Sequence, residues 1–177
     1  MQRILSVACC LALCSVSALA QKEAKTARGA MSDQQFVDLA AQTDMVEANL
    51  GQLAQTAAGS QAVKDYGQML TTDHTSDFNK LDSVAQQAGL TRPNAIDSEH
   101  NKSMITPFQK LKGAAFDRKL IQAAVAGHIK AIAVYKKEAA DAQSPAIKSY
   151  ADGALPVLQK HLEQAQALEK SGGKEAK

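Results

Sequence analysis

Four polar residues occupy core positions of otherwise apolar helical stripes, and their side chains are of the kinds that bind transition metals. They belong to four different predicted helices: Glu47, His74, His128 and His161. Imidazole nitrogens and carboxylate oxygens are suitable ligands for zinc, iron, manganese or copper. The pattern therefore predicts one transition-metal ion, of one of these four kinds, inside a helical bundle. Asp73 and Asp44 are further candidates, each as an additional ligand or as the hydrogen-bond partner of a ligand.

The stripes that carry these residues have the spacing of helices that pack in a bundle. Core positions recur at alternating intervals of four and three residues along residues 36–57, 63–88 and 147–168. Side chains spaced in this way share one face of a helix. A further helix, from about residue 113, carries His128 along one side. Suitable N-cap residues precede three of the four helices: Ser32, Ser60 and Ser144.

The four helices form two similar pairs. Residues 60–66 (SQAVKDY) match residues 144–150 (SPAIKSY), and each segment opens the second helix of a helical hairpin. A longer connection joins the pairs over residues 89–112 and holds at most a short helix, interrupted near Pro107. We therefore predict an all-α fold, a ferritin-like four-helix bundle over residues 32–170. The sequence leaves open whether the connection crosses the bundle.

The position of each candidate along its helix places the four at similar heights. In the first hairpin, Glu47 precedes Ser60 by almost the same stretch of chain by which His74 follows it. In the second hairpin, His128 and His161 lie almost equally far before and after Ser144. At about 1.5 Å of rise per residue, the two members of each hairpin face each other, and the hairpins differ by roughly one turn.

The same four residues permit an interpretation without a metal. A buried carboxylate or imidazole without a partner costs free energy, so these side chains must pair with one another, keep water or bind a cation. A polar layer that is satisfied internally would fix the register of the helices, as buried polar residues do in coiled coils. The sequence leaves both interpretations open.

The beginning of the chain predicts export. Residues 1–20 combine a basic start at Arg3, an apolar run and an Ala-Leu-Ala triplet at residues 18–20. Together these features indicate a signal peptide that is cleaved before Gln21. We expect the mature protein in a bacterial periplasm or otherwise exported.

All cysteines of the chain lie within the predicted signal peptide: Cys9, Cys10 and Cys14. The mature chain would then have no thiol and no disulfide. A lipoprotein anchor at Cys14 is the alternative, and the large Leu13 before it argues against this alternative. We predict no transmembrane segment in the mature chain, and disordered segments at residues 21–31 and 171–177.

The charge balance excludes one class of partner. The chain has 20 basic and 18 acidic residues, and the predicted signal peptide holds one base and no acid, which leaves 19 bases against 18 acids. Nucleic-acid binding needs a clustered basic surface, so we predict none. A protein partner in the cell envelope and the oligomeric state stay open.

Several motifs resemble those of a known family. They are Phe36-x-x-x-Ala40, Asp73-His74, Gly113-x-x-Phe116-Asp117 and Leu155-Pro156-x-x-x-x-His161, together with the helices of Glu47 and His128. Over residues 32–168 the chain is similar to exported bacterial ferritin-like proteins that are grouped as a domain of unknown function and often labelled outer membrane proteins. The resemblance implies a ferritin-like bundle, export to the envelope and metal binding, and it brings no established reaction.

The ligand set departs from that of di-iron bundles. Those sites use two Glu-x-x-His motifs, but the residues three before the three histidines are Thr71, Val125 and Leu158. A set rich in histidine fits one ion better than a bridged pair. We predict an exported metal-binding bundle with a role in envelope stress or metal handling. A metal-free structural or interaction bundle is the alternative, and a metal-dependent redox enzyme comes third, so binding is favoured over catalysis.

Overall fold

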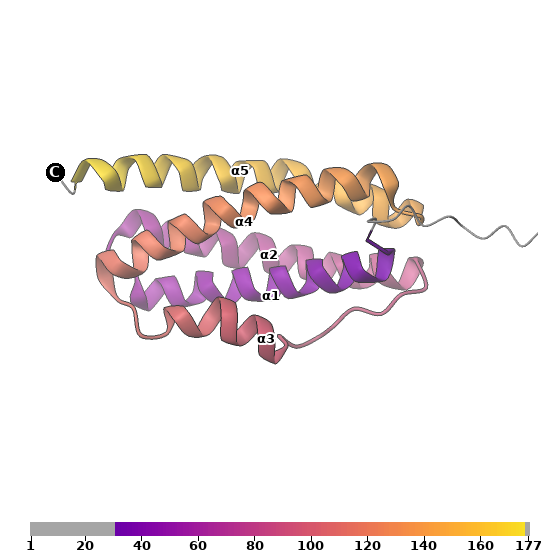
Figure 1. Cartoon of the computed structure of the whole chain (residues 1–177), viewed down its shortest axis with the longest axis horizontal. Helices are drawn as coiled ribbons and strands as arrows, with labels where there is room; N and C mark the ends of the chain where they lie inside the picture. Colours follow the sequence, from indigo (N-terminus) through magenta and orange to yellow (C-terminus); the bar gives the residue numbers. More distant parts are fainter. Residues whose placement is uncertain (1–30, 176–177) are drawn as a thin grey trace, which may run out of the picture.

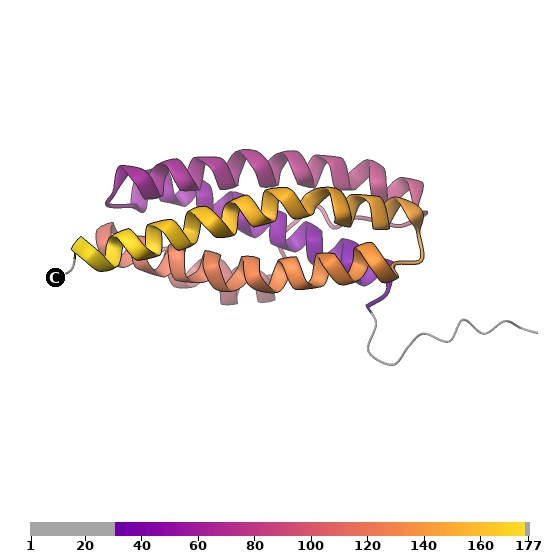
Figure 2. The ribbon, with the colours of Figure 1, turned by 90° about the horizontal axis from the view of Figure 1, so that it is seen from above.

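Every named secondary-structure element in the part of the chain that the structure describes is a helix. The computed structural model describes residues 31–175, with side chains to residue 172, so the predicted signal peptide lies outside it. Four long helices lie alongside one another (Figure 1 and Figure 2): α1 (Asp33–Ala57), α2 (Gln61–Gln87), α4 (Gly113–Asp141) and α5 (Pro145–Glu175). Three short segments lie between α2 and α4: α3 (Ser98–His100), the π-helix η1 (Asn101–Ile105) and the 3₁₀ helix η2 (Thr106–Phe108). The predicted all-α class is confirmed for these residues.

Local sequence accounts for where the long helices begin. The hydroxyl group of Ser32 accepts a hydrogen bond from the backbone N–H of Gln35, whose side chain accepts one from the backbone N–H of Ser32. This reciprocal pair starts α1. Ser60 caps α2 through the backbone N–H of Val63, and Pro145 occupies the first position of α5. The predicted starts of these helices therefore agree with the structure.

The ends of two helices differ in how well the sequence predicts them. Gly89 follows α2 with φ 69°, a left-handed conformation that favours glycine and ends a helix. Helix α5 continues to Glu175, whereas the sequence predicts a disordered tail from residue 171. Two glycines weaken the helix there, but no proline follows that would stop it.

Each hairpin turn is held by the first turn of a helix in the other hairpin. The carboxylate of Asp117, in α4, accepts hydrogen bonds of 2.9 Å from the backbone N–H groups of residues 59 and 60. The carboxylate of Asp33, in α1, accepts bonds of 2.9 and 2.6 Å from the backbone N–H groups of residues 143 and 144. The two turns therefore lie at opposite ends of the molecule. An aspartate of each hairpin binds the turn of the other hairpin.

The connection between the hairpins runs the length of the molecule. At its start, the backbone of Thr91 exchanges two hydrogen bonds with the side chain of Gln34, near the beginning of α1. The side chain of Gln42 then bonds to the backbone of Ala95 and Asp97. The connection ends where α4 begins, beside the turn between α1 and α2 (Figure 1). This crossover makes α1 parallel to α5 and α2 parallel to α4.

Two apolar clusters form the core. The cluster toward the α4–α5 turn includes Phe36, Leu81, Tyr135, Ile147 and Tyr150. The cluster toward the α1–α2 turn includes Leu70, Phe108, Phe116 and Leu120. Among residues 31–175, no helix combines the length and the apolar character needed to cross a membrane. Between the two clusters, the helices carry a layer of buried polar side chains.

Candidate metal centre

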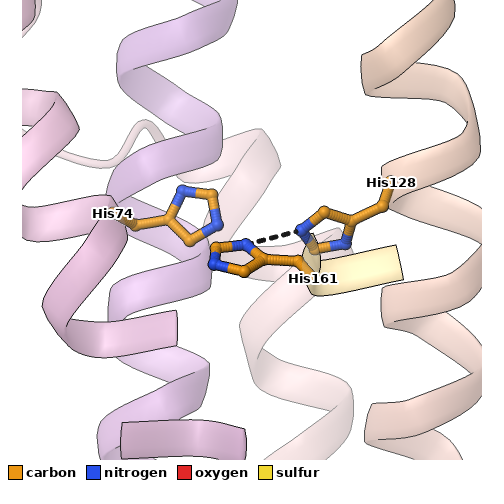
Figure 3. A group of neighbouring side chains, drawn as sticks. All are labelled: His74, His128 and His161. Carbon is orange, nitrogen blue, oxygen red and sulfur yellow. Dashed lines mark hydrogen bonds between the residues drawn. The ribbon is translucent and has the colours of Figure 1, made fainter. Parts of the chain in front are cut away.

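Three histidines from three helices meet in this polar layer. His74 comes from α2, His128 from α4 and His161 from α5, and Figure 3 shows the three rings grouped together. One ring nitrogen from each histidine lies within 4.8 Å of those of the other two. The three residues are only 4 %, 2 % and 0 % exposed, respectively. The structure thus brings together three of the residues that the sequence predicts as ligands.

Each ring is held by a hydrogen-bond acceptor. Nδ1 of His74 lies 2.8 Å from Oδ1 of Asp44, and Nε2 of His161 lies 2.9 Å from Oδ2 of Asp73. Nδ1 of His128 lies 2.9 Å from the carbonyl oxygen of Ala124. A carbonyl group or an ionised carboxylate only accepts hydrogen bonds, so the hydrogen-bond pattern assigns the ring hydrogen to these three nitrogens.

In the neutral form of each ring, the other nitrogen therefore presents a lone pair. Nε2 of His74 has no hydrogen-bond partner. Nε2 of His128 and Nδ1 of His161 lie 3.2 Å apart, within hydrogen-bond distance (Figure 3). In the two neutral rings, however, the hydrogens lie on the opposite nitrogens, which bond to Ala124 and Asp73. Two nitrogens bound to one ion at about 2.0–2.1 Å would lie roughly 3.3–3.6 Å apart in trigonal or tetrahedral geometry. The separation of the His128–His161 pair is close to that range, and the nitrogen of His74 lies within 4.8 Å of both.

Two buried carboxylates lie on α1 beside the histidines. Glu47 is 8 % exposed, and its Oε2 atom has no hydrogen-bond partner. Oδ2 of Asp44 is also buried without a partner. The negative charge of Glu47 acts on both His74 and His128 in the direction that raises the pKa of each. Glu47 therefore faces the histidine layer, although it lies outside the tight group of three nitrogens.

Asp73 occupies an outer position. Its Oδ2 atom is bonded to His161 and lies 3.5 Å from Nζ of Lys160, and its side chain is 28 % exposed. Of the two roles that the sequence allows for Asp73, this geometry corresponds to the hydrogen-bond partner of a ligand. Asp44 has the same relation to His74, but it is almost completely buried.

Burial keeps two of the histidines neutral. It lowers the pKa of His161 to about 4 despite the bond with Asp73, and it lowers the pKa of His128. Burial also acts to lower the pKa of His74, but the hydrogen bond with Asp44 and nearby carboxylate charges outweigh this effect and leave the pKa raised. Burial raises the pKa of Asp44 to about 6. His128 and His161 are thus in the neutral form that binds metals.

Some features of the layer have no counterpart in the sequence reasoning. The carbonyl group of Ala124, which orients His128, is a backbone atom one turn earlier in the same helix, and no residue type signals it. The Tyr150 hydroxyl group donates a 2.5 Å hydrogen bond to Asp77, which lies about one turn after His74 on α2. The position of Asp77 on the core stripe was the available signal for that contact.

Comparison with known proteins identifies the family. The family model described as "Domain of unknown function (DUF4142)" matches residues 18–168, so the chain belongs to this family. No curated protein matches the chain. Two solved structures of CopM share its fold. CopM in a silver-bound form, obtained by co-crystallization, is 15 % identical, with a TM-score of 0.62 over 80 % of this chain and 98 % of CopM. CopM in a Cu(II)-bound form is 14 % identical, with a TM-score of 0.59 over 80 % and 97 %.

Proposed function

We propose that this member of the DUF4142 family binds one transition-metal ion through His74, His128 and His161. One observation carries the proposal: three buried ring nitrogens face one another, and the hydrogen of each ring is already donated elsewhere. Without a cation, these buried lone pairs lack hydrogen-bond donors among the described residues, which costs free energy. With a cation, the same lone pairs become ligands.

We assign Glu47 to the fourth position of the site. Its buried Oε2 atom has no partner, and α1 is the one long helix that contributes no histidine. A carboxylate would offset part of the charge of the ion, which three neutral imidazoles cannot do. Asp44 and Asp73 instead orient His74 and His161 through their outer ring nitrogens. Such outer partners typically account for about 10–100-fold in metal affinity.

Among zinc, iron, manganese and copper, we favour copper. Imidazole suits zinc, copper and iron, and divalent copper binds a given site most tightly in the first-row series. The CopM structures, which hold silver and Cu(II), support testing these ions first, although the low identity limits the comparison itself to the fold. A histidine set without thiolates still accepts zinc, so zinc is the necessary competitor in any measurement.

The arrangement of the helices supports a ferritin-like bundle. Two helical hairpins joined by a single long crossover connection are characteristic of that fold. We further propose that residues 1–20 are removed on export and that the mature protein acts in the periplasm, in metal handling or in the response to metal stress. Binding, rather than a reaction, is the activity that the three-histidine geometry supports.

Elemental analysis tests this proposal. The mature protein, residues 21–177, would be purified from periplasm without a histidine tag, and we expect about one equivalent of metal per chain. The double substitution His128→Ala/His161→Ala should remove it. His100→Ala is the matched control, because His100 is bonded to the exposed Asp97 in the connection and lies outside the histidine group.

A protein without bound metal would contradict this proposal. If the protein contains no metal, and copper, silver and zinc all leave its melting temperature unchanged, the metal site is excluded. The three histidines and their carboxylate partners would then form the metal-free layer that fixes helix register. The Asp44–His74 bond between α1 and α2 and the Asp73–His161 bond between α2 and α5 are the contacts that would perform this role.

A further inference from the structure

A pocket opens from the surface toward the histidine layer. Its volume is about 330 Å³, and it lies between α1, α2 and the part of the connection at residues 94–96. Its lining includes the side-chain amide groups of Asn49, Gln52 and Asn94 and the thioether of Met45. Asp44 and His74 also line it, although both residues are almost fully buried. The pocket therefore leads from solvent to one member of the candidate site.

We propose that this pocket is the route by which the metal ion reaches the site, with the Asp44 carboxylate as its first charged contact. This inference rests on the proposed function. Oδ2 of Asp44 has no hydrogen-bond partner, and neither has Nε2 of His74. An ion that reaches Asp44 thus finds an unused carboxylate oxygen, and the unused nitrogen of His74 is the next ligand inward.

The charges around the pocket favour a cation. No lysine or arginine is among its lining residues, and its carboxamide oxygens and thioether are neutral donors that can replace water around an ion. Arg92 lies close by on the same connection, where its guanidinium group stacks 3.6 Å above the ring of Phe78 and pairs with Asp82. Its charge is therefore balanced by a carboxylate outside the pocket.

Two other routes are less suitable for a cation. The half-buried Asp73 offers a way to His161, but the ammonium group of Lys160 lies 3.5 Å from the Asp73 carboxylate and would repel an approaching ion. A second pocket, of about 370 Å³, lies between α4 and α5. Its lining includes one base, Lys136, and one acid, Asp152, but none of the residues assigned to the metal site, so it does not lead to that site.

The test is to fill each pocket and measure the rate of metal uptake. Gln52→Trp fills the proposed route, and Gln159→Trp fills the second pocket, which has a similar volume. Both glutamines are exposed helix residues, so the two variants are closely matched. The chain has no native tryptophan, so the new fluorophore also reports whether each variant is folded. Uptake of Ag⁺ and Cu²⁺ would be followed by stopped-flow competition with a chromophoric chelator.

We expect Gln52→Trp to slow uptake at least about tenfold and to leave the equilibrium affinity nearly unchanged, because a route affects rates in both directions. Gln159→Trp should match the unmodified protein. If Gln52→Trp does not fold, Asn49→Trp, another exposed position in the same pocket, replaces it. Unchanged uptake in the folded pocket-filled variant would overturn the proposed route, and faster uptake in Lys160→Glu would then indicate entrance beside Asp73.

The failure of this inference differs from the failure of the proposed function. If the unmodified protein binds no ion at equilibrium, the metal site itself is wrong. If it binds one equivalent, and the pocket-filled variant takes up the ion at the same rate, only the route is wrong. A variant that loses affinity and rate in equal measure would also overturn the route, because the pocket would then be part of the binding site.

Discussion

Two buried polar groups lie in the same core, and they differ in whether their hydrogen bonds are complete. In the tyrosine group, the Tyr150 hydroxyl group donates to Asp77, and both tyrosine rings pack edge-on against Phe36 at centroid distances of 4.9 Å for Tyr135 and 6.1 Å for Tyr150. In the histidine group, three ring nitrogens turn toward one another, and in the neutral form of the rings none of these three nitrogens carries a hydrogen.

The unpartnered atoms show this difference directly. Among the described residues, buried side-chain atoms without a hydrogen-bond partner belong to Asp44, Glu47, His74 and Glu138. Three of these four residues surround the candidate metal centre, and none is a tyrosine. Burial alone is therefore a poor sign of a ligand site. A buried group whose acceptors outnumber its donors is a better one, because an added cation, proton or water molecule is needed to satisfy it.

The largest expected effect is a rise in melting temperature on metal binding, which should depend on the histidine group and not on the tyrosine group. At a free metal concentration of about 100 times the dissociation constant, binding stabilises the folded state by about 2.7 kcal/mol. For a chain of this size, that raises the melting temperature by roughly 5–10 °C. His128→Ala/His161→Ala should abolish this rise in calorimetry, and Tyr150→Phe should retain it. A metal-dependent rise that survives the double substitution would place the ion elsewhere.

The next effect compares the two carboxylates that orient histidines. Asp44→Asn should lower metal affinity by about 10–100-fold, because the buried carboxylate fixes which nitrogen of His74 carries the hydrogen. Asp73→Asn should have a smaller effect, since Asp73 is partly exposed and its charge is shared with Lys160. Competition titrations with a chelator of known affinity measure both. Equal losses would show that burial of the carboxylate is unimportant.

A third prediction concerns the tyrosine group alone. Tyr150→Phe removes the hydrogen bond that the tyrosine hydroxyl group donates to the Asp77 carboxylate and should destabilise the protein by about 1–3 kcal/mol. Metal affinity should stay the same. Urea unfolding of the metal-free protein, followed by circular dichroism, measures the first quantity, and chelator competition measures the second. A matching fall in affinity would mean that the two groups are coupled through α2.

The smallest effect is expected for an apolar replacement in the metal-free protein. His161→Leu removes a buried ring nitrogen and also the bond to Asp73, but the partly exposed Asp73 carboxylate keeps Lys160 and solvent as partners, so the stability should remain within about 1 kcal/mol of the original. The same variant should not bind the ion. Strong destabilisation of the metal-free variant would favour the structural interpretation, because the histidine would then be contributing to the fold without a metal.

The sequence predicted correctly the features that depend on a single residue type or on the periodicity of a single helix. Ser32, Ser60 and Pro145 start helices, and the spacing of apolar residues placed His74, His128 and His161 on inward faces. These signals depend on the periodicity of a single helix, so they do not require knowledge of the partner helices.

The parts that sequence could not predict depend on how separate helices meet. The direction of the connection follows from contacts such as Gln34 with Thr91, which no local pattern encodes. The choice between a ligand and an orienting partner for Asp73 depends on the distance between α2 and α5. Equally, Glu47 and Asp44 lie one turn apart on the same face of α1, and only the assembled structure shows that Asp44 holds His74.

The hydrogen bonds between each hairpin and the turn of the other hairpin suggest that the molecule could assemble from two separate fragments. Because Asp33 and Asp117 each hold the turn of the opposite hairpin, a chain cut in the loop near residue 94 would yield two fragments with complementary docking surfaces. One fragment would carry His74 and the other His128 and His161. Neither fragment alone would have a complete site, so reassembly of the two halves would become a reporter of the metal ion.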